Sequence, residues 1–204
     1  MESLIEAAIQ GNSPLVRTIL QQGTSPDAPD AHGETALNWA AHLGHTAVVK
    51  DLLAAGADRE MVGDFHRATP LLLAAYGGHR GIVALFAVLA DVNARDPRGA
   101  TALMLALEPH STVQKLPRRV LSIVETLIQA GADLDLQDQK GNTALLWASQ
   151  VGNSDAVRLL YNAGADVRIK NHAGLTALDV AAQHDHADII ALLGNLPLSP
   201  KHDK

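Results

Sequence analysis

Residues 138–166 read DQKGNTALLWASQVGNSDAVRLLYNAGAD, and this stretch is the clearest copy of a unit that recurs along the 204-residue chain. Asp138, Gly141 and Thr143 indicate a tight turn at its start, because Asp accepts backbone hydrogen bonds, Gly adopts positive φ and Thr can cap a following helix. A first helix is expected to begin at about Ala144. The stretch therefore predicts a turn that leads directly into a helix.

The unit is expected to contain two helices, each with one apolar face. Leu145 and Ala148 lie three residues apart on the first helix, which Gly152 ends. Apolar residues recur over 156–161 on the second helix, and Gly164 ends it in the left-handed conformation. A single unit has too little core to bury these faces, so its stability must come from stacking on neighbouring units.

Other segments of the chain repeat the same order of turn, helix, glycine, helix and Gly-Ala-Asp. Because such units stack continuously, the chain is expected to form one domain. We expect about six units including caps: an N-terminal capping unit over 1–29, unit two over 30–63, unit three over 64–95, unit four over 96–137, unit five over 138–170 and a C-terminal capping unit over 171–196, followed by a tail at 197–204.

Five units share a motif that begins with threonine: TALN at Thr35, TPLL at Thr69, TALM at Thr101, TALL at Thr143 and TALD at Thr176. With turn, helix and Gly-Ala-Asp signals in register, the chain resembles the ankyrin repeat family, whose units of about 33 residues form a β-turn and two antiparallel helices. The resemblance implies an all-α solenoid with short β-hairpin or turn fingers. The family favours Thr-Pro-Leu-His, and that histidine is absent here, so the sequence does not indicate how polar bonds join the units.

Units three and four depart from the pattern. Arg67 occupies the turn position that glycine holds in the other units, the finger at 59–63 is one residue longer, and no glycine follows Leu89. A left-handed conformation costs a non-glycine residue ~1 kcal/mol, so the backbone of unit three is expected to differ from its neighbours. In unit four an insertion at 108–118, expected to be an ordered surface loop, separates the first helix from a second helix over about 120–130.

Composition excludes several classes of protein. The formal net charge is −6, whereas a nucleic-acid footprint needs a basic patch. The chain has no cysteine, which excludes disulfides and thiolate-bound zinc. No apolar run reaches the ~18 residues that span a bilayer, and the N-terminus lacks the basic and apolar regions of a signal peptide. We therefore expect a cytoplasmic monomer that has no cofactor and contacts neither membrane nor nucleic acid.

Ten histidines raise the alternative of an enzyme or ligand-binding protein with a histidine and carboxylate site on the fingers. His45, His79 and His186 occupy the position where the ankyrin family has a structural Gly-His pair, which favours a structural role. His32 and His66 lie at turn tips, where a metal-binding or titrating role and simple surface exposure both stay open. Since no Ser, His and Asp set or pair of carboxylates stands out, we predict a non-catalytic protein. An enclosed pocket with two titratable groups would favour the enzyme.

A nucleic-acid binder is the third reading. It depends only on Lys115, Arg118 and Arg119, which lie in or beside the insertion. Phosphate contacts make binding strongly dependent on salt concentration. Binding to DNA or RNA whose affinity falls steeply as salt concentration rises would therefore support this reading.

The ankyrin resemblance implies that a partner is bound by the turn tips and the exposed side of each first helix, which line a concave groove. Four of the six aromatic residues, Trp39, Phe65, Tyr76 and Trp147, fall in this set. Aromatic residues dominate binding hot spots, so their placement favours a protein or peptide partner of an adaptor, inhibitor or effector-type scaffold. Alternatively, Trp39 and Trp147 are half-buried packing residues. The predicted partner-binding residues are Trp39, His42, Leu43, Phe65, His66, Tyr76, Arg98, Leu105, Gln139, Lys140, Trp147 and Gln150.

Overall fold

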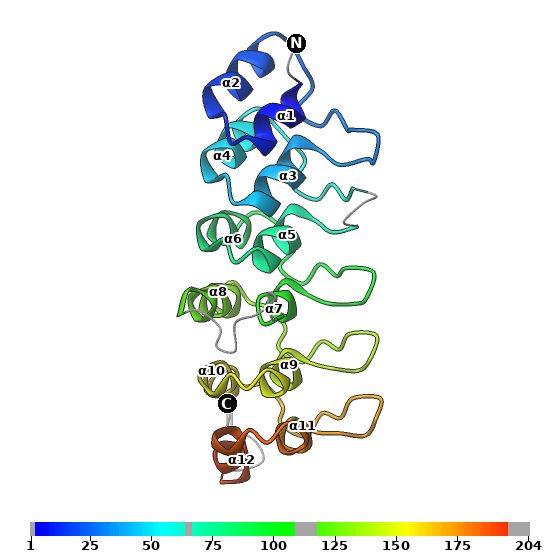
Figure 1. The fold of residues 1–204 in the computed structure, drawn as a ribbon, viewed down its shortest axis with the longest axis vertical. Coiled ribbons are helices and arrows are strands. Elements are labelled where there is room, and N and C mark those ends of the chain that lie inside the picture. The colour runs from blue at the N-terminus through cyan, green and yellow to red at the C-terminus, as the bar shows by residue number, and fades with distance from the viewer. Residues whose placement is uncertain (1–2, 64–66, 109–117, 196–204) are drawn as a thin grey trace.

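The computed structural model describes residues 3–63, 67–108 and 118–195. Its helices form a single column of stacked pairs (Figure 1). The first helix of each pair belongs to one layer and the second helix to the other, and the turns between units project as fingers beside the first-helix layer. The prediction of an all-α, ankyrin-type solenoid is confirmed.

Each layer contains one helix from every unit. The first-helix layer consists of α1 (Leu4–Ile9), α3 (Ala36–Leu43), α5 (Pro70–Tyr76), α7 (Ala102–Leu105), α9 (Ala144–Gln150) and α11 (Ala177–Gln183). The second-helix layer consists of α2 (Ser13–Gln21), α4 (Thr46–Ala54), α6 (Arg80–Phe86), α8 (Arg118–Gln129), α10 (Ser154–Asn162) and α12 (Ala187–Gly194). In the fingers, Arg95 and Thr101 form an isolated antiparallel bridge.

Threonine starts the first helix of every unit after the N-terminal one. In each case the side-chain oxygen accepts a hydrogen bond from the backbone N–H three residues later, which satisfies one of the unpaired donors at a helix start. The capping residues are Thr35, Thr69, Thr101, Thr143 and Thr176. The predicted capping role of Thr143 is therefore confirmed, and the repeated motif explains why the first helices share one register.

Small and branched apolar side chains form a core that runs the length of the column. Ala40 and Ala41 of α3 and Ala74 and Ala75 of α5 are fully buried between neighbouring helices. Alanine at these positions lets the first helices approach closely, while leucine, isoleucine and valine fill the space between the two layers. Phe86, at the end of α6, has the largest volume among the fully buried side chains of the described residues.

Histidines of the second-helix starts bond to the preceding unit, a connection that the Thr-led motif did not indicate. The ring Nε2 of His45 lies 2.9 Å from the Ile9 carbonyl oxygen, and that of His79 lies 2.9 Å from the His42 carbonyl oxygen. His186 makes the same bond to Gln150, at 3.1 Å. Polar bonds between units are therefore present, and they support the structural role predicted for these three histidines.

A second set of bonds joins the units at the base of the fingers. The backbone N–H of the Asp that follows α4, α6, α8 and α10 donates to a side-chain oxygen of the preceding unit, at 2.9 to 3.0 Å. The donor and acceptor pairs are Asp58 and Asp27, Asp91 and Glu60, Asp133 and Asn93, and Asp166 and Asp135.

Unit three differs from the expectation at Arg67. Arg67 keeps the left-handed conformation, with φ of 50° against 68° for Gly33, so the backbone does not avoid the strained region here. The difference lies in the turn: the Arg67 N–H donates to Gly63 O, four residues back, whereas the Gly33 N–H donates to Asp30 O, three residues back.

Unit four contains the predicted second helix but a very short first helix. The second helix, α8, begins two residues before the predicted range, at Arg118, and ends at Gln129. The first helix, α7, has only 4 residues. Residues 109–117, which the sequence predicts as an ordered loop, lie outside the described residues.

Amide protons of α6 are expected to exchange with solvent faster than those of α10. The α6 helix has 7 residues against 9 in α10, and its N-cap His79 makes no side-chain cap, whereas Asn153 caps α10. Because stacked units couple only to their neighbours, such local differences become local opening. Native-state hydrogen exchange measures this. Arg67→Gly removes ~1 kcal/mol of strain and should slow opening of unit three about fivefold. Equal protection of α6 and α10 would contradict the prediction.

Candidate binding surface on the first-helix layer

The predicted partner-binding residues that the structure describes all come from the first helices or the turns before them. We call this surface, formed by α3, α5, α7, α9, α11 and their preceding turns, the groove face. Trp39, His42 and Leu43 lie on α3, Tyr76 on α5, Leu105 on α7, Trp147 and Gln150 on α9, and Arg98, Gln139 and Lys140 on turns. Phe65 and His66 lie outside the described residues.

Aromatic rings from units two and three are in contact on the groove face. The ring of His42 stacks on that of Tyr76 at a centroid distance of 6.4 Å and an interplanar angle of 10°. The ring of Trp39 meets His42 edge-on, also at 6.4 Å. Tyr76 is 39% exposed and the adjacent Leu43 is 40% exposed, so this row offers apolar area to a partner.

The turn aspartate of a unit orients the tryptophan of its first helix. The Trp39 ring Nε1 donates to Asp30 Oδ2 at 3.2 Å, and the Trp147 ring Nε1 donates to Asp138 Oδ2 at 3.1 Å. Both tryptophans are half-buried. The packing role considered for them is therefore present, together with an exposed ring portion on the groove face.

The same aspartates fix the turns themselves. Asp138 Oδ1 accepts the backbone N–H groups of Lys140 and Asn142, both at 2.8 Å. Asp30 accepts those of His32 and Glu34 in the same way. Burial by itself raises the pKa of Asp30, but hydrogen bonds from the His32 backbone and the Trp39 ring outweigh it, and the pKa is lowered. The spacing of nine residues between Asp and Trp is a sequence signal that pattern reading missed.

Tips of neighbouring fingers are hydrogen-bonded to one another. The Gln139 N–H donates to Arg98 O at 2.8 Å, and the His172 N–H donates to Lys140 O at 2.9 Å. The side chain of Gln139 adds a bond to Pro97 O. The turns of units four, five and six are therefore held in fixed positions, which lowers the entropic cost of presenting their side chains to a partner.

Arg98 is held by two carboxylates of its own unit. Its guanidinium donates to both carboxylate oxygens of Glu108 at 3.1 Å and to Asp96 at 2.9 Å. The hydrogen bonds that Arg98 donates to Glu108, and then those to Asp96, raise the pKa of Arg98 against the opposing effect of burial. The predicted contact residue thus also braces the turn against the end of α7.

Two hollows open on the groove face. One, of about 290 Å³, lies between α5 and α7 and is lined mainly by apolar side chains, with Arg98 and Asp96 at its edge. Leu105 was predicted as a residue facing the groove, but it is only 4% exposed, because α7 packs against α5 there; it contributes to the wall of this hollow.

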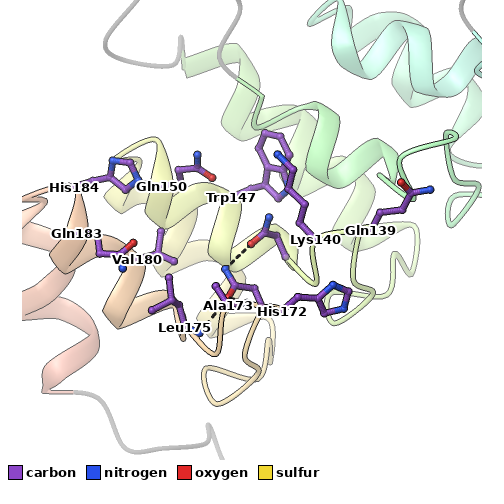
Figure 2. A pocket seen from close by; sticks show the side chains of 12 residues that line it. Gln139, Lys140, Trp147, Gln150, His172, Ala173, Leu175, Val180, Gln183 and His184 are labelled. Atoms are coloured by element: carbon purple, nitrogen blue, oxygen red, sulfur yellow. Dashed lines mark hydrogen bonds between the residues drawn. The ribbon is translucent and has the colours of Figure 1, made fainter.

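The larger hollow, of about 540 Å³, lies between α9 and α11 (Figure 2). It brings together the predicted Gln139, Lys140, Trp147 and Gln150 with residues of unit six. Two of these, His172 and Gln183, are positions that the ankyrin resemblance also implies as a turn tip and an exposed first-helix residue; the others are Asn171, Ala173, Leu175, Val180 and His184. Ala173 and Val180 occupy in unit six the repeat positions of Lys140 and Trp147 in unit five, and this equivalence was the available signal for them.

The histidine and carboxylate alternative gains no support from the geometry. Over the described ranges, no group of three or more His, Cys, Asp or Glu side chains is arranged to hold a metal ion. His45, His79 and His186 instead bond to backbone carbonyls of neighbouring units. Within the same described part of the chain, no helix is long and apolar enough to cross a membrane.

Known proteins resemble this chain in both sequence and structure. Neurogenic locus notch homolog protein 1 of Xenopus tropicalis is 35% identical over 136 residues, which are 64% of this chain but only 5% of the Notch protein. The crystal structure of the ankyrin repeat protein EF0377 has a TM-score of 0.83 at 33% identity and covers 95% of this chain and 97% of its own. An ankyrin repeat domain from Acinetobacter baumannii AYE has a TM-score of 0.81 at 32% identity, covering 93% and 95%.

A family model described as ankyrin repeats in three copies matches residues 2–62 and 115–199. The unmatched interval between these ranges contains Arg67, the short α6 and the short α7, which are the irregular parts of the stack. Since the match covers more than half of the sequence and the fold agrees along nearly its whole length, the chain belongs to the ankyrin repeat family.

Proposed function

We propose that this protein is a non-catalytic interaction module that binds a segment of a protein partner along its groove face. Ankyrin repeats are generally protein–protein interaction modules, and solenoids use the extended surface that stacking creates. The observation that carries the proposal for this chain is the row of Trp39, His42 and Tyr76, since Tyr76 is 39% exposed and lines the smaller hollow of the groove face.

An adaptor, inhibitor or effector-type scaffold would use this surface in the same way. The partner is expected to contact the face between units two and five, with the aromatic side chains as anchors. A cytoplasmic location, a monomeric state and the absence of nucleic-acid binding remain predictions from the sequence, which cell fractionation, analytical ultracentrifugation and a salt titration with DNA and RNA would test.

Tyr76→Ala is expected to weaken partner binding about thirtyfold. Truncating an aromatic anchor typically costs ~2 kcal/mol or more, and each 1.4 kcal/mol is tenfold in affinity. A photo-crosslinking amino acid at Tyr76 would capture the partner, and titration calorimetry with the purified partner would give the change in Kd.

Val88 provides the matched control for this experiment. It is 81% exposed and lies two residues after the end of α6, a helix of the second-helix layer. A crosslinker at Val88 should capture no partner, and Val88→Ala should bind as tightly as the parent. If Tyr76→Ala retains helicity and full affinity, the partner does not use this part of the groove face.

A further inference from the structure

The hollow between α9 and α11 has an electrostatic character opposite to that of the whole chain. Lys140, His172 and His184 line it, together with the side-chain amides of Gln150 and Gln183. No carboxylate lines it among the described residues, although the chain has a formal net charge of −6. Figure 2 shows these side chains arranged around the opening, with the ring of Trp147 on α9 among them.

The turn carboxylate of Asp138 lies behind this lining and not in it, so Lys140 is the charged group that faces the hollow. Asp138 is 7% exposed, and its oxygens accept hydrogen bonds from Lys140 N, Asn142 N and the Trp147 ring. The Lys140 ammonium forms no ion pair with any described residue. Its backbone is fixed by the His172 N–H bond to its carbonyl, so the charge is presented from a rigid turn. The hollow is therefore suited to an anionic group.

The smaller hollow, between α5 and α7, suits an apolar group. Leu72, Leu73, Leu105 and Tyr76 supply most of its wall. The only charged side chains among its lining residues, Arg98 and Asp96, are paired with each other at 2.9 Å. An aliphatic or aromatic side chain of a partner would gain burial here without leaving an unpaired charge.

The centres of the two hollows are two helix spacings apart along the first-helix layer, because α7 and α9 lie between α5 and α11. Packed helices are spaced about 8 to 10 Å apart, so the centres of the hollows are separated by about 16 to 20 Å along the stack. An extended peptide advances about 3.3 Å per residue. This separation corresponds to about five or six residues of extended chain.

We propose that the partner segment is an extended acidic peptide. It places an apolar side chain between α5 and α7 and an Asp or Glu side chain between α9 and α11, about five or six residues away. Lys140 is the residue that selects the acidic side chain. This inference rests on the proposed function, since it specifies the chemistry of a segment bound along the groove face.

Selection from a display library of random 12-residue peptides on the full-length protein tests the proposal. Peptides retained by the parent should be enriched in Asp or Glu about five or six positions from an apolar residue. Selection on Lys140→Glu should lose the acidic enrichment. Lys50→Glu makes the same change of charge at an exposed site on α4, in the second-helix layer, and should retain it.

Fluorescence anisotropy with one selected, labelled peptide then gives the size of the effect. Lys140→Glu should weaken binding about tenfold or more, because it removes an attractive charge and adds a repulsive one. Lys140→Gln should fall between the two, and Lys50→Glu should match the parent. Replacing the acidic residue of the peptide by its amide should make binding indifferent to the charge at Lys140.

The outcomes separate this inference from the function on which it rests. Peptides that bind the parent better than Tyr76→Ala but carry no acidic enrichment would overturn the acidic-peptide proposal and leave the groove function standing. Retention of acidic peptides by Lys140→Glu would overturn the role of Lys140. If no peptide distinguishes the parent from Tyr76→Ala, peptide binding on the groove face is itself wrong.

Discussion

Gly44→Ala is expected to destabilise the stack by about 3 kcal/mol or more, whereas Gly56→Ala should cost about 1 kcal/mol. Both glycines are left-handed, with φ of 85° and 87°, so alanine is strained to the same degree at each. They differ in their surroundings. A Cβ at Gly44 would lie 2.5 Å from the His79 ring, while a Cβ at Gly56 would meet nothing within 4 Å.

The His79 ring cannot move away without losing its own bond. Its Nε2 lies 2.9 Å from the carbonyl oxygen of His42 in the preceding unit. Displacing the ring therefore adds the loss of a hydrogen bond, about 1 kcal/mol, to the cost of overpacking, about 1 to 3 kcal/mol. The same arrangement places His45 against Gly11 and His186 against Gly152. The contact between a histidine ring and a glycine of the preceding unit therefore recurs along the stack.

Urea unfolding of the two variants, followed by circular dichroism, measures the difference. The double variant Gly44→Ala with His79→Ala serves as a further control, since it removes the ring that the new methyl group would strike. The double variant should lose less stability than the sum of the single changes. Equal destabilisation by Gly44→Ala and Gly56→Ala would show that the histidine and glycine contact does not hold the units together.

The helix starts could be predicted from the sequence because each is decided within four residues. Thr143 needs only the backbone N–H of Leu146 to form its cap, so the motif carries its own structural information. The same locality holds for the glycines that end the helices. Local signals of this kind gave the fold and the alternation of helices correctly.

The bonds at the base of the fingers could not be predicted, because their partners lie more than 30 residues apart and the acceptor residue varies. Asp27, Glu60 and Asn93 all accept the N–H of an aspartate in the next unit, although their side chains differ. A search for one repeated residue type at a fixed position therefore finds nothing.

The candidate site was predicted residue by residue, but its shape was not. Trp147 and Gln150 were assigned to the groove from their positions on one helix. The hollow that they line also requires His172 and Gln183 from the following unit. Leu105 occupies in unit four the repeat position that Trp147 occupies in unit five, but it is only 4% exposed. The shape of the hollow and the burial of Leu105 both depend on how neighbouring units are placed relative to one another. That placement is set by side-chain packing and not by the repeated motif.

Asn38→Ala is expected to destabilise the protein by about 3 kcal/mol. Asn38 is fully buried, whereas the equivalent positions in three other units hold the apolar Leu72, Met104 and Leu146. Its Nδ2 donates to Met61 O at 3.1 Å and to Ala68 O at 3.3 Å. Removing this amide leaves two carbonyls without their donor, at about 1 to 3 kcal/mol each, and opens a small cavity.

The position of these two carbonyls explains why a polar residue is present at Asn38. Met61 lies in the finger that is one residue longer than the others, and Ala68 follows the left-handed Arg67. Asn38 therefore joins the longer finger of its own unit, at Met61, to Ala68 at the start of unit three. Asn38→Leu restores the volume and the residue type of unit five but not the hydrogen bonds, so it should still lose about 2 kcal/mol.

Asp179 supplies the matched control for Asn38. It occupies the same repeat position in unit six and bonds to Thr176 as Asn38 bonds to Thr35, but its described hydrogen bonds stay within its own unit. Asp179→Ala removes the bonds that Thr176 donates to the Asp179 carboxylate, leaves the Thr176 cap in place, and should cost about 1 kcal/mol. The excess loss for Asn38→Ala in urea unfolding then measures the two amide bonds to Met61 O and Ala68 O together with the small cavity. An Asn38→Ala variant no less stable than Asp179→Ala would mean that the irregular finger holds its conformation without Asn38.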